Sequence, residues 1–255
     1  MLAEITSHEL AAALEDCAAN LLWEAGIIRP PVHARHVAEQ LGLIVATAPC
    51  AAHRARFMRL AAPAAGCRGR ELIVVGPSER PERDHWAVAH EIGESVAGRV
   101  FDRLGIRPDA ASPAARELVA NRLAGCLLLP RFWFEVDGRE LDWDLFSLKA
   151  RYATASHELI ARRMLELRPP IVVTVCDLGR TSWRRSNVAR HVPRLLPAER
   201  GAWARSHTSG LPYSATLDPG ATGLERIRCW PIHEPDWKRE IILSQIADSA
   251  GDFES

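Results

Sequence analysis

Residues 86–94 read Trp-Ala-Val-Ala-His-Glu-Ile-Gly-Glu, within a stretch from about Pro81 to Phe101 that has helical periodicity. Residues four apart on a helix share a face, so His90 and Glu94 can point at one ion. In the related H-E-x-x-H motif, two histidines bind zinc and the glutamate between them activates a water molecule. Because a carboxylate is also a zinc ligand, this stretch predicts His90 and Glu94 as metal ligands and Glu91 as the catalytic base.

A third ligand is expected from the next strong helix, which Ser112-Pro113 opens and Pro130 ends. Glu117 and Asn121 lie four residues apart and share one face of this helix. An antiparallel pair of helices would bring Glu117 within reach of the first two ligands, and Asn121 would then orient a ligand. Short motifs also match by chance. A merely solvated helix face, or an ion pair of Glu94 with Arg99 or Arg83, therefore stays open.

The sequence around these residues resembles that of the ImmA/IrrE family of metallopeptidases. The similarity covers about residues 8–167 and includes Trp86-Ala-Val-Ala-His-Glu-Ile-Gly, Glu117-x-x-Ala-Asn-x-Leu-Ala and Leu127-Leu-Leu-Pro. It implies a zincin-like fold, in which a small antiparallel sheet lies beside an active-site helix and further helices follow. It also implies zinc at His90 and Glu117, Glu91 as general base, and a regulatory protein as substrate, commonly a helix-turn-helix repressor.

Position 94 departs from this family, which normally has its second histidine there. Three readings stay open: Glu94 binds the metal in its place, the site has lost its metal, or another residue such as His85 compensates. His85 lies five positions from His90, which is a poor angular match on a helix. A site rich in carboxylates also suits harder ions, so manganese or magnesium is an alternative to zinc.

The order of expected elements predicts an α+β fold with two domains. Residues 1–168 form the zincin-like domain with its C-terminal helices, and residues 169–255 form a smaller β-rich or α/β domain of unknown role. Arg168-Pro-Pro is the expected boundary. The strand Glu71–Val75, just before the site, is expected to offer an edge to an extended peptide. A polar, acidic hinge is expected over residues 137–144, before helices at about 145–152 and 156–167.

Bulk composition fits a globular protein with balanced charge. The 255 residues are 47% hydrophobic, and 32 basic side chains match 32 acidic ones, so direct nucleic-acid binding is not favoured. The sequence contains neither a long apolar run nor a signal-peptide pattern, which predicts a cytoplasmic protein without a membrane partner. The six cysteines form no C-x-x-C pair and are expected to be reduced thiols.

Two further segments could bind ligands. Residues 149–163 could form a helix-turn-helix that places Arg162 and Arg163 on phosphates, although a packing helix with a basic end is favoured. In the aromatic-rich C-terminal part, His233 is expected to be structural rather than a metal ligand.

The leading interpretation is a zinc-dependent endopeptidase (a hydrolase) that cleaves a regulatory protein. A second interpretation is a non-catalytic binding protein that keeps the peptidase scaffold, which Glu94 favours. A DNA-binding transcriptional regulator is the third.

Overall fold

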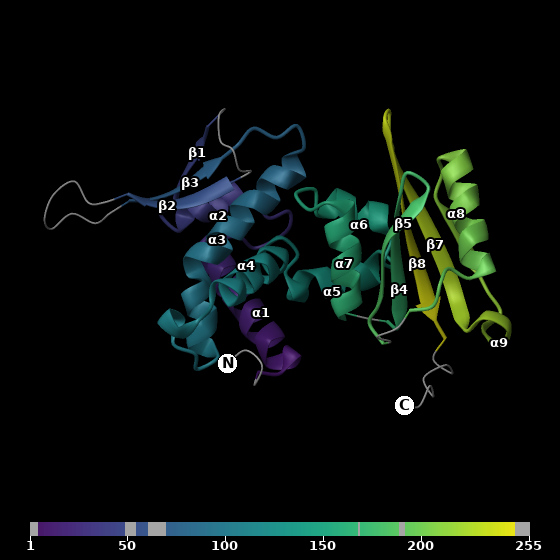
Figure 1. Ribbon diagram of the computed structural model, residues 1–255, viewed down its shortest axis with the longest axis horizontal. Helices are drawn as coiled ribbons and strands as arrows, with labels where there is room; N and C mark the ends of the chain where they lie inside the picture. Colours follow the sequence, from purple (N-terminus) through teal and green to yellow (C-terminus); the bar gives the residue numbers. More distant parts are fainter. Residues whose placement is uncertain (1–4, 49–54, 61–69, 168, 189–191, 248–255) are drawn as a thin grey trace, which may run out of the picture. The chain divides into compact units, whose positions relative to one another are not determined.

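The computed structural model describes residues 5–48, 55–60, 70–167, 169–188 and 192–247 (Figure 1). The chain divides into two compact units, Met1–Ser156 and His157–Ser255. The division lies before the last helix of the expected first domain, whereas the sequence placed the boundary at residue 168. Within the described residues, no helix is long and apolar enough to cross a membrane.

Unit 1 is mainly helical, with one small sheet. Its first helix begins directly after Thr6, because Thr6 and Glu9 form a reciprocal capping box. Ser112 caps the fourth helix through the amide of Ala115. The helices are α1 (Ser7–Glu24), α2 (Ala34–Gln40), α3 (Pro81–Arg103), the short 3-10 helix Pro108–Ala110, α4 (Pro113–Leu128), α5 (Arg131–Glu140) and α6 (Leu145–Arg151).

The sheet of unit 1 is mixed rather than antiparallel. Its strands are β1 (Ile44–Thr47), β2 (Ala55–Leu60) and β3 (Arg70–Val75), in the spatial order β1-β3-β2. β3 pairs antiparallel with β2 and parallel with β1. The chain reverses at β2 before returning through the middle of the sheet, so β1 and β3 run the same way. The α+β class is confirmed, but two details of the expectation are wrong, because the sheet is not wholly antiparallel and β3 is its central strand rather than an edge.

The core of unit 1 forms where α3 crosses α4. Ala89, Gly93 and Ala97 lie on one stripe of α3 and are buried. A Cβ built on Gly93 would lie 2.8 Å from the carbonyl oxygen of Ala120 on α4. Real Cβ atoms do not approach that closely, so only glycine permits this separation of the two helices.

The expected acidic hinge at residues 137–144 is a turn only in its second half, because residues 137–140 are the end of α5 and residues 141–144 connect it to α6. Its acidic residue Asp137 accepts hydrogen bonds from the Arg151 guanidinium and the Tyr152 hydroxyl, both at 2.6 Å. Gly138 lets the Trp143 ring pack directly on the helix backbone, where a side chain would collide with it. Residues later in the chain thus provide the hydrogen-bond donors for Asp137, which is why an acidic segment can be helical here.

Unit 2 is a five-stranded antiparallel sheet in the order β5-β4-β8-β7-β6, with helices α7 and α8 on opposite sides (Figure 1). The first six residues of β4 are all buried, as in a strand that is covered on both faces. The elements are α7 (His157–Leu167), β4 (Ile171–Asp177), β5 (Arg180–Ser186), α8 (Pro197–Ser209), β6 (Tyr213–Thr216), α9 (Pro219–Thr222), β7 (Leu224–Glu234) and β8 (Trp237–Ile246).

Candidate metal centre

Helix α3 presents the predicted ligands from two successive turns. His90 and Glu94 are both half-buried, and their spacing of four residues puts them on one face of the helix. On the opposite wall of the site, α4 contributes Glu117. One ligand atom from each of the three side chains lies within 4.8 Å of the others, and His90 Nε2 is 3.6 Å from Glu117 Oε2. The structure thus brings together the three residues that the sequence predicts as ligands.

The close packing of α3 on α4 explains this convergence. Gly93 lies between the two ligands of α3 and touches the backbone of Ala120, which lies between Glu117 and Asn121 on α4. The contact that only glycine allows therefore sits directly behind the cluster. Any residue with a Cβ at position 93 would push Glu117 away from His90.

Asn121 holds the Glu117 carboxylate from one side. Its amide nitrogen Nδ2 donates to Glu117 Oε1 at 2.8 Å. The other oxygen, Oε2, is the one nearest to His90. Because the Glu117 side chain is 60% exposed, it would otherwise have considerable rotational freedom, so Asn121 is placed to orient a ligand, as the sequence predicts.

Glu91 is not one of the three clustered residues and is buried, with 9% of its surface exposed. Its Oε2 accepts a hydrogen bond of 2.6 Å from the backbone amide of Phe57 on β2. Burial raises the pKa of Glu91, and the charges of Glu94 and Glu117 act in the same direction. The Phe57 hydrogen bond and the charge of His90 oppose that shift but do not cancel it.

Two alternatives from the sequence are not seen among the described residues. Arg99 pairs with Glu24 at 2.8 Å rather than with Glu94. The ring of His85 packs against His33 at 5.4 Å between centroids, and His85 is not part of the cluster of possible ligands. The Phe57 amide was missed by sequence reasoning. No side-chain motif could have revealed it, because it is a backbone group from a distant strand.

The fold and the cluster define a metallopeptidase-like unit followed by a sheet domain. The chain belongs to the family described as Peptidase_M78, IrrE N-terminal-like domain, whose model matches residues 38–165. It is therefore a peptidase-like or IrrE-like regulatory protein, and the matched range contains all five predicted site residues: His90, Glu91, Glu94, Glu117 and Asn121.

Among solved structures, one described as a Mycobacterium tuberculosis transcriptional regulator resembles this chain with a TM-score of 0.64. The match covers 91% of this chain and 75% of that chain at 18% sequence identity. At that identity the likeness concerns the fold alone. No curated protein matches the sequence.

Proposed function

We propose that this chain is a zinc-dependent endopeptidase of the cytoplasm that cleaves a regulatory protein, such as a helix-turn-helix repressor. The observation that carries the proposal is the pairing of a three-residue ligand cluster with a separate, buried carboxylate. Glu91 lies next to the cluster in sequence but contributes no ligand atom to it. A glutamate in that place is available to move protons.

The donor set fits a divalent ion. One imidazole nitrogen and two carboxylates converge from two helices, and a zinc ion accepts both kinds of ligand. The three glutamates of the site outnumber its single histidine, so its electrostatic field attracts a cation. Manganese or magnesium would compete with zinc better here than in a site with two histidines. When bound, the ion would supply Lewis acidity to the scissile carbonyl and to the attacking water.

Glu91 is positioned for general base and then general acid catalysis. The Phe57 amide occupies its Oε2, and within the described part of the chain no hydrogen bond engages Oε1. That second oxygen can take a proton from the attacking water and pass it to the leaving amine. Burial of the carboxylate also keeps bulk water from competing for the same proton.

The edge strand β2 is the expected binding surface for a peptide. The Phe57 amide points toward Glu91 and away from β3. In an antiparallel pair, alternate residues of an edge strand direct their N–H and C=O groups away from the partner strand. The outer edge of β2 therefore lies on the side of Glu91. An extended peptide could pair with that edge and pass beside Glu91. This replaces β3, which lies in the middle of the sheet.

The test compares cleavage by the zinc-loaded wild-type chain and by Glu91→Gln. Both are incubated with a proteome-derived peptide library, and new amino termini are identified by mass spectrometry. We expect a set of cleavage sites for the wild type and a loss of about 10²–10⁴-fold in rate for Glu91→Gln. Zinc content should be equal in the two proteins. Identical cleavage patterns would contradict the proposal.

The second candidate is a non-catalytic regulatory binding protein on the same scaffold, and Glu94 favours it. If zinc binds but wild type and Glu91→Gln give the same cleavage pattern, or none, this candidate replaces the first.

DNA binding has less support. Arg162 pairs with Glu158 at 2.7 Å and stacks on Trp183, and Arg163 is only 4% exposed and pairs with Glu166, so both arginines have partners within unit 2.

A further inference from the structure

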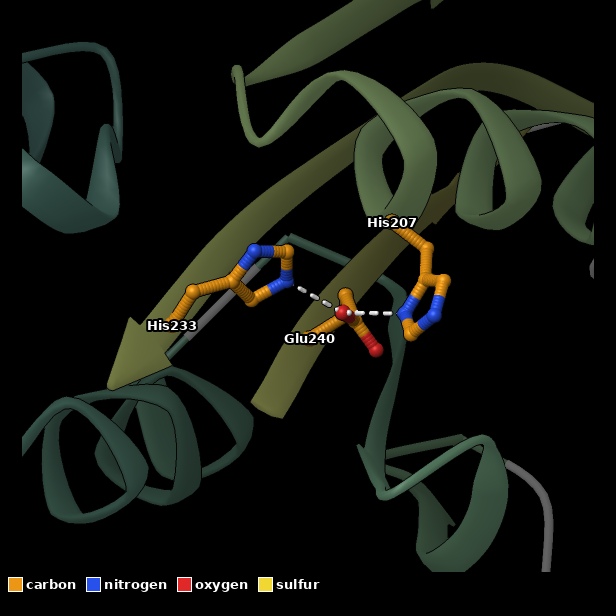
Figure 2. A group of neighbouring side chains, drawn as sticks. All are labelled: His207, His233 and Glu240. Carbon is orange, nitrogen blue, oxygen red and sulfur yellow. Dashed lines mark hydrogen bonds and ion pairs between the residues drawn. The ribbon is translucent and has the colours of Figure 1, made fainter. Parts of the chain in front are cut away.

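Unit 2 contains a second cluster of two histidines and a glutamate, far from the first in sequence. His207 Nδ1 and His233 Nε2 both contact Oε1 of Glu240, at 2.8 Å and 2.6 Å (Figure 2). One ligand atom from each residue lies within 4.8 Å of the other two. Figure 2 shows the two imidazoles approaching the carboxylate from different directions, one from α8 and one from β7.

The fold of unit 2 determines this convergence. On the hairpin of β7 and β8, Pro231 pairs with Glu240 and His233 pairs with Lys238. His233 and Glu240 are therefore diagonal neighbours on one face of the sheet. Helix α8 packs against β7 and β8 and brings His207 to the same place.

Trp203 fixes the other side of the carboxylate. It lies one helical turn before His207, and its indole nitrogen Nε1 donates to Glu240 Oε2 at 2.8 Å. An indole N–H can only donate, so Oε2 is the acceptor in this contact. It also leaves Oε1 as the oxygen that faces the histidines. The same division of oxygens is seen at Glu117, where Asn121 binds one oxygen and the other faces His90.

The charge of Glu240 lacks the counter-ion that another buried glutamate of unit 2 has. Glu199 is also fully buried, and the Arg184 guanidinium pairs with both of its oxygens at 3.0 Å and 2.9 Å. Among the described residues, the ion pairs of Glu240 are with His207 and His233 alone. A buried carboxylate is normally paired with a cation or bound to a metal, and the two imidazoles beside Glu240 offer nitrogen ligands for such an ion.

We propose that His207, His233 and Glu240 bind a divalent transition-metal ion, with zinc as the best fit. Two imidazoles and one carboxylate are a common zinc set, whereas magnesium and calcium prefer oxygen ligands. Zinc ligands at tetrahedral angles lie about 3.3 Å apart, so each imidazole nitrogen would move outward from its present 2.8 or 2.6 Å by about 0.5–0.7 Å. Each would present a lone pair to the ion instead of an N–H to Glu240.

The cluster is accessible to an ion from solvent. The side chain of His207 is 38% exposed and that of His233 is 21% exposed, while Glu240 is fully buried. Three protein ligands leave a fourth position for water or for an anionic group of a partner. The ion would fasten the end of the β7–β8 hairpin to α8. This inference does not depend on the proposed peptidase activity.

The experiment uses the full chain with the first site removed by His90→Ala and Glu117→Ala. Zinc stoichiometry is measured by elemental analysis, and affinity by competition with a chelator. We expect this background protein to keep one zinc per chain. Adding His207→Ala, the most exposed of the three ligands, should remove that zinc. Adding Trp203→Phe, which keeps the ring bulk but loses the N–H, should weaken zinc binding by about ten- to a hundredfold.

His8→Ala is the matched control, because His8 is an exposed histidine on α1 and its loss should change nothing. Far-ultraviolet circular dichroism verifies that each variant is folded. If His207→Ala fails to fold, Trp203→Phe decides the question. A background protein that holds no zinc would show that the cluster is only a hydrogen-bonded carboxylate. Zinc held equally well after His207→Ala or Trp203→Phe would overturn the proposal too.

Discussion

The His90 cluster and the His207 cluster use the same kinds of side chain in opposite surroundings. In the first, the ligand carboxylate of Glu117 is 60% exposed, and its nearest approach to the histidine is 3.6 Å. In the second, the carboxylate of Glu240 is fully buried and accepts hydrogen bonds from both histidines. The first cluster also has the buried carboxylate of Glu91 beside it, with no arginine or lysine bonded to it among the described residues.

From this difference we propose that the two clusters would use a metal ion in different ways. A catalytic site needs an open coordination position and a proton-transfer group that is not itself a ligand, and the His90 cluster offers Glu91 for that role. The His207 cluster joins a helix to a hairpin through one buried residue, which is the arrangement of a structural or regulatory site. Substitutions that affect one cluster and spare the other test this division.

The largest effect is expected from Gly93→Ala. The new Cβ would lie 2.8 Å from the Ala120 carbonyl oxygen, so α3 and α4 must separate. Overpacking of this kind costs about 1–3 kcal/mol of unfolding free energy. The separation also moves Glu117 from His90, so zinc affinity at the first cluster should fall by more than about tenfold. Urea unfolding and zinc titration measure the two effects.

Gly98→Ala on the same helix is the matched control. A Cβ there would meet the Pro108 side chain at 3.8 Å, an ordinary contact. Alanine is the better helix former by about 1 kcal/mol, so this variant should be at least as stable as the wild type and keep both zinc affinities. If the two alanine variants behave alike, close packing of α3 on α4 does not build the site.

Asn121→Ala is expected to have the next largest effect, on metal affinity alone. Loss of the 2.8 Å hydrogen bond frees the exposed Glu117 carboxylate, which should weaken zinc at the first cluster by about ten- to a hundredfold. The second cluster should be unaffected, and the unfolding free energy should change by less than about 0.5 kcal/mol. An unchanged affinity at the first cluster would mean that Asn121 does not orient a ligand.

Glu94→His should sharpen the comparison by making the first cluster more like the second. It gives the helix the H-E-x-x-H spacing of zinc peptidases and removes one negative charge. We expect zinc to bind about tenfold more tightly and manganese to compete less well, because imidazole suits zinc better than it suits manganese. Competition between the two ions at the purified protein measures this. No change in either affinity would place Glu94 outside the ligand set.

Much of the His90 cluster could be predicted from the sequence because its residues lie on two regular helices. The spacing of His90 and Glu94, and that of Glu117 and Asn121, follows from helical geometry alone. The contact between the two helices was expected from an antiparallel pairing of neighbouring helices, and Gly93 is the physical reason that they come so close.

The His207 cluster could not be predicted in the same way. Its members come from a helix and two strands, and only the register of the β7–β8 hairpin makes His233 and Glu240 neighbours. The sequence led us to expect a structural role for His233 and gave no reason to consider His207 or Glu240. Similarly, the last four residues of α5 were expected to belong to a hinge, because Asp137 finds its hydrogen-bond partners only in the folded chain.

The smallest effect is expected at Asp177, a carboxylate of unit 2 that pairs with an arginine instead of histidines. It lies opposite Arg239 across β4 and β8, and the guanidinium donates to both of its oxygens, at 2.6 Å and 3.1 Å. Burial acts to raise the pKa of Asp177, but the Arg239 and Ser182 hydrogen bonds outweigh it and hold the pKa below its ordinary value. A group whose pKa is depressed on folding stabilises the protein above the pKa of the unfolded chain, near 3.9, and loses that contribution as the pH falls through its lower folded value.

Asp177→Asn should therefore lower the unfolding free energy by about 1 kcal/mol at pH 7, and the difference from the wild type should shrink below about pH 4. Hydrogen exchange of the β4 and β8 amides measures this within unit 2, and Glu158 remains to pair with Arg239 at 2.6 Å. Because no metal is involved, the loss should be the same with and without zinc. A loss at Asp177 that depended on zinc would mean that the second ion stabilises the whole sheet rather than the end of one hairpin.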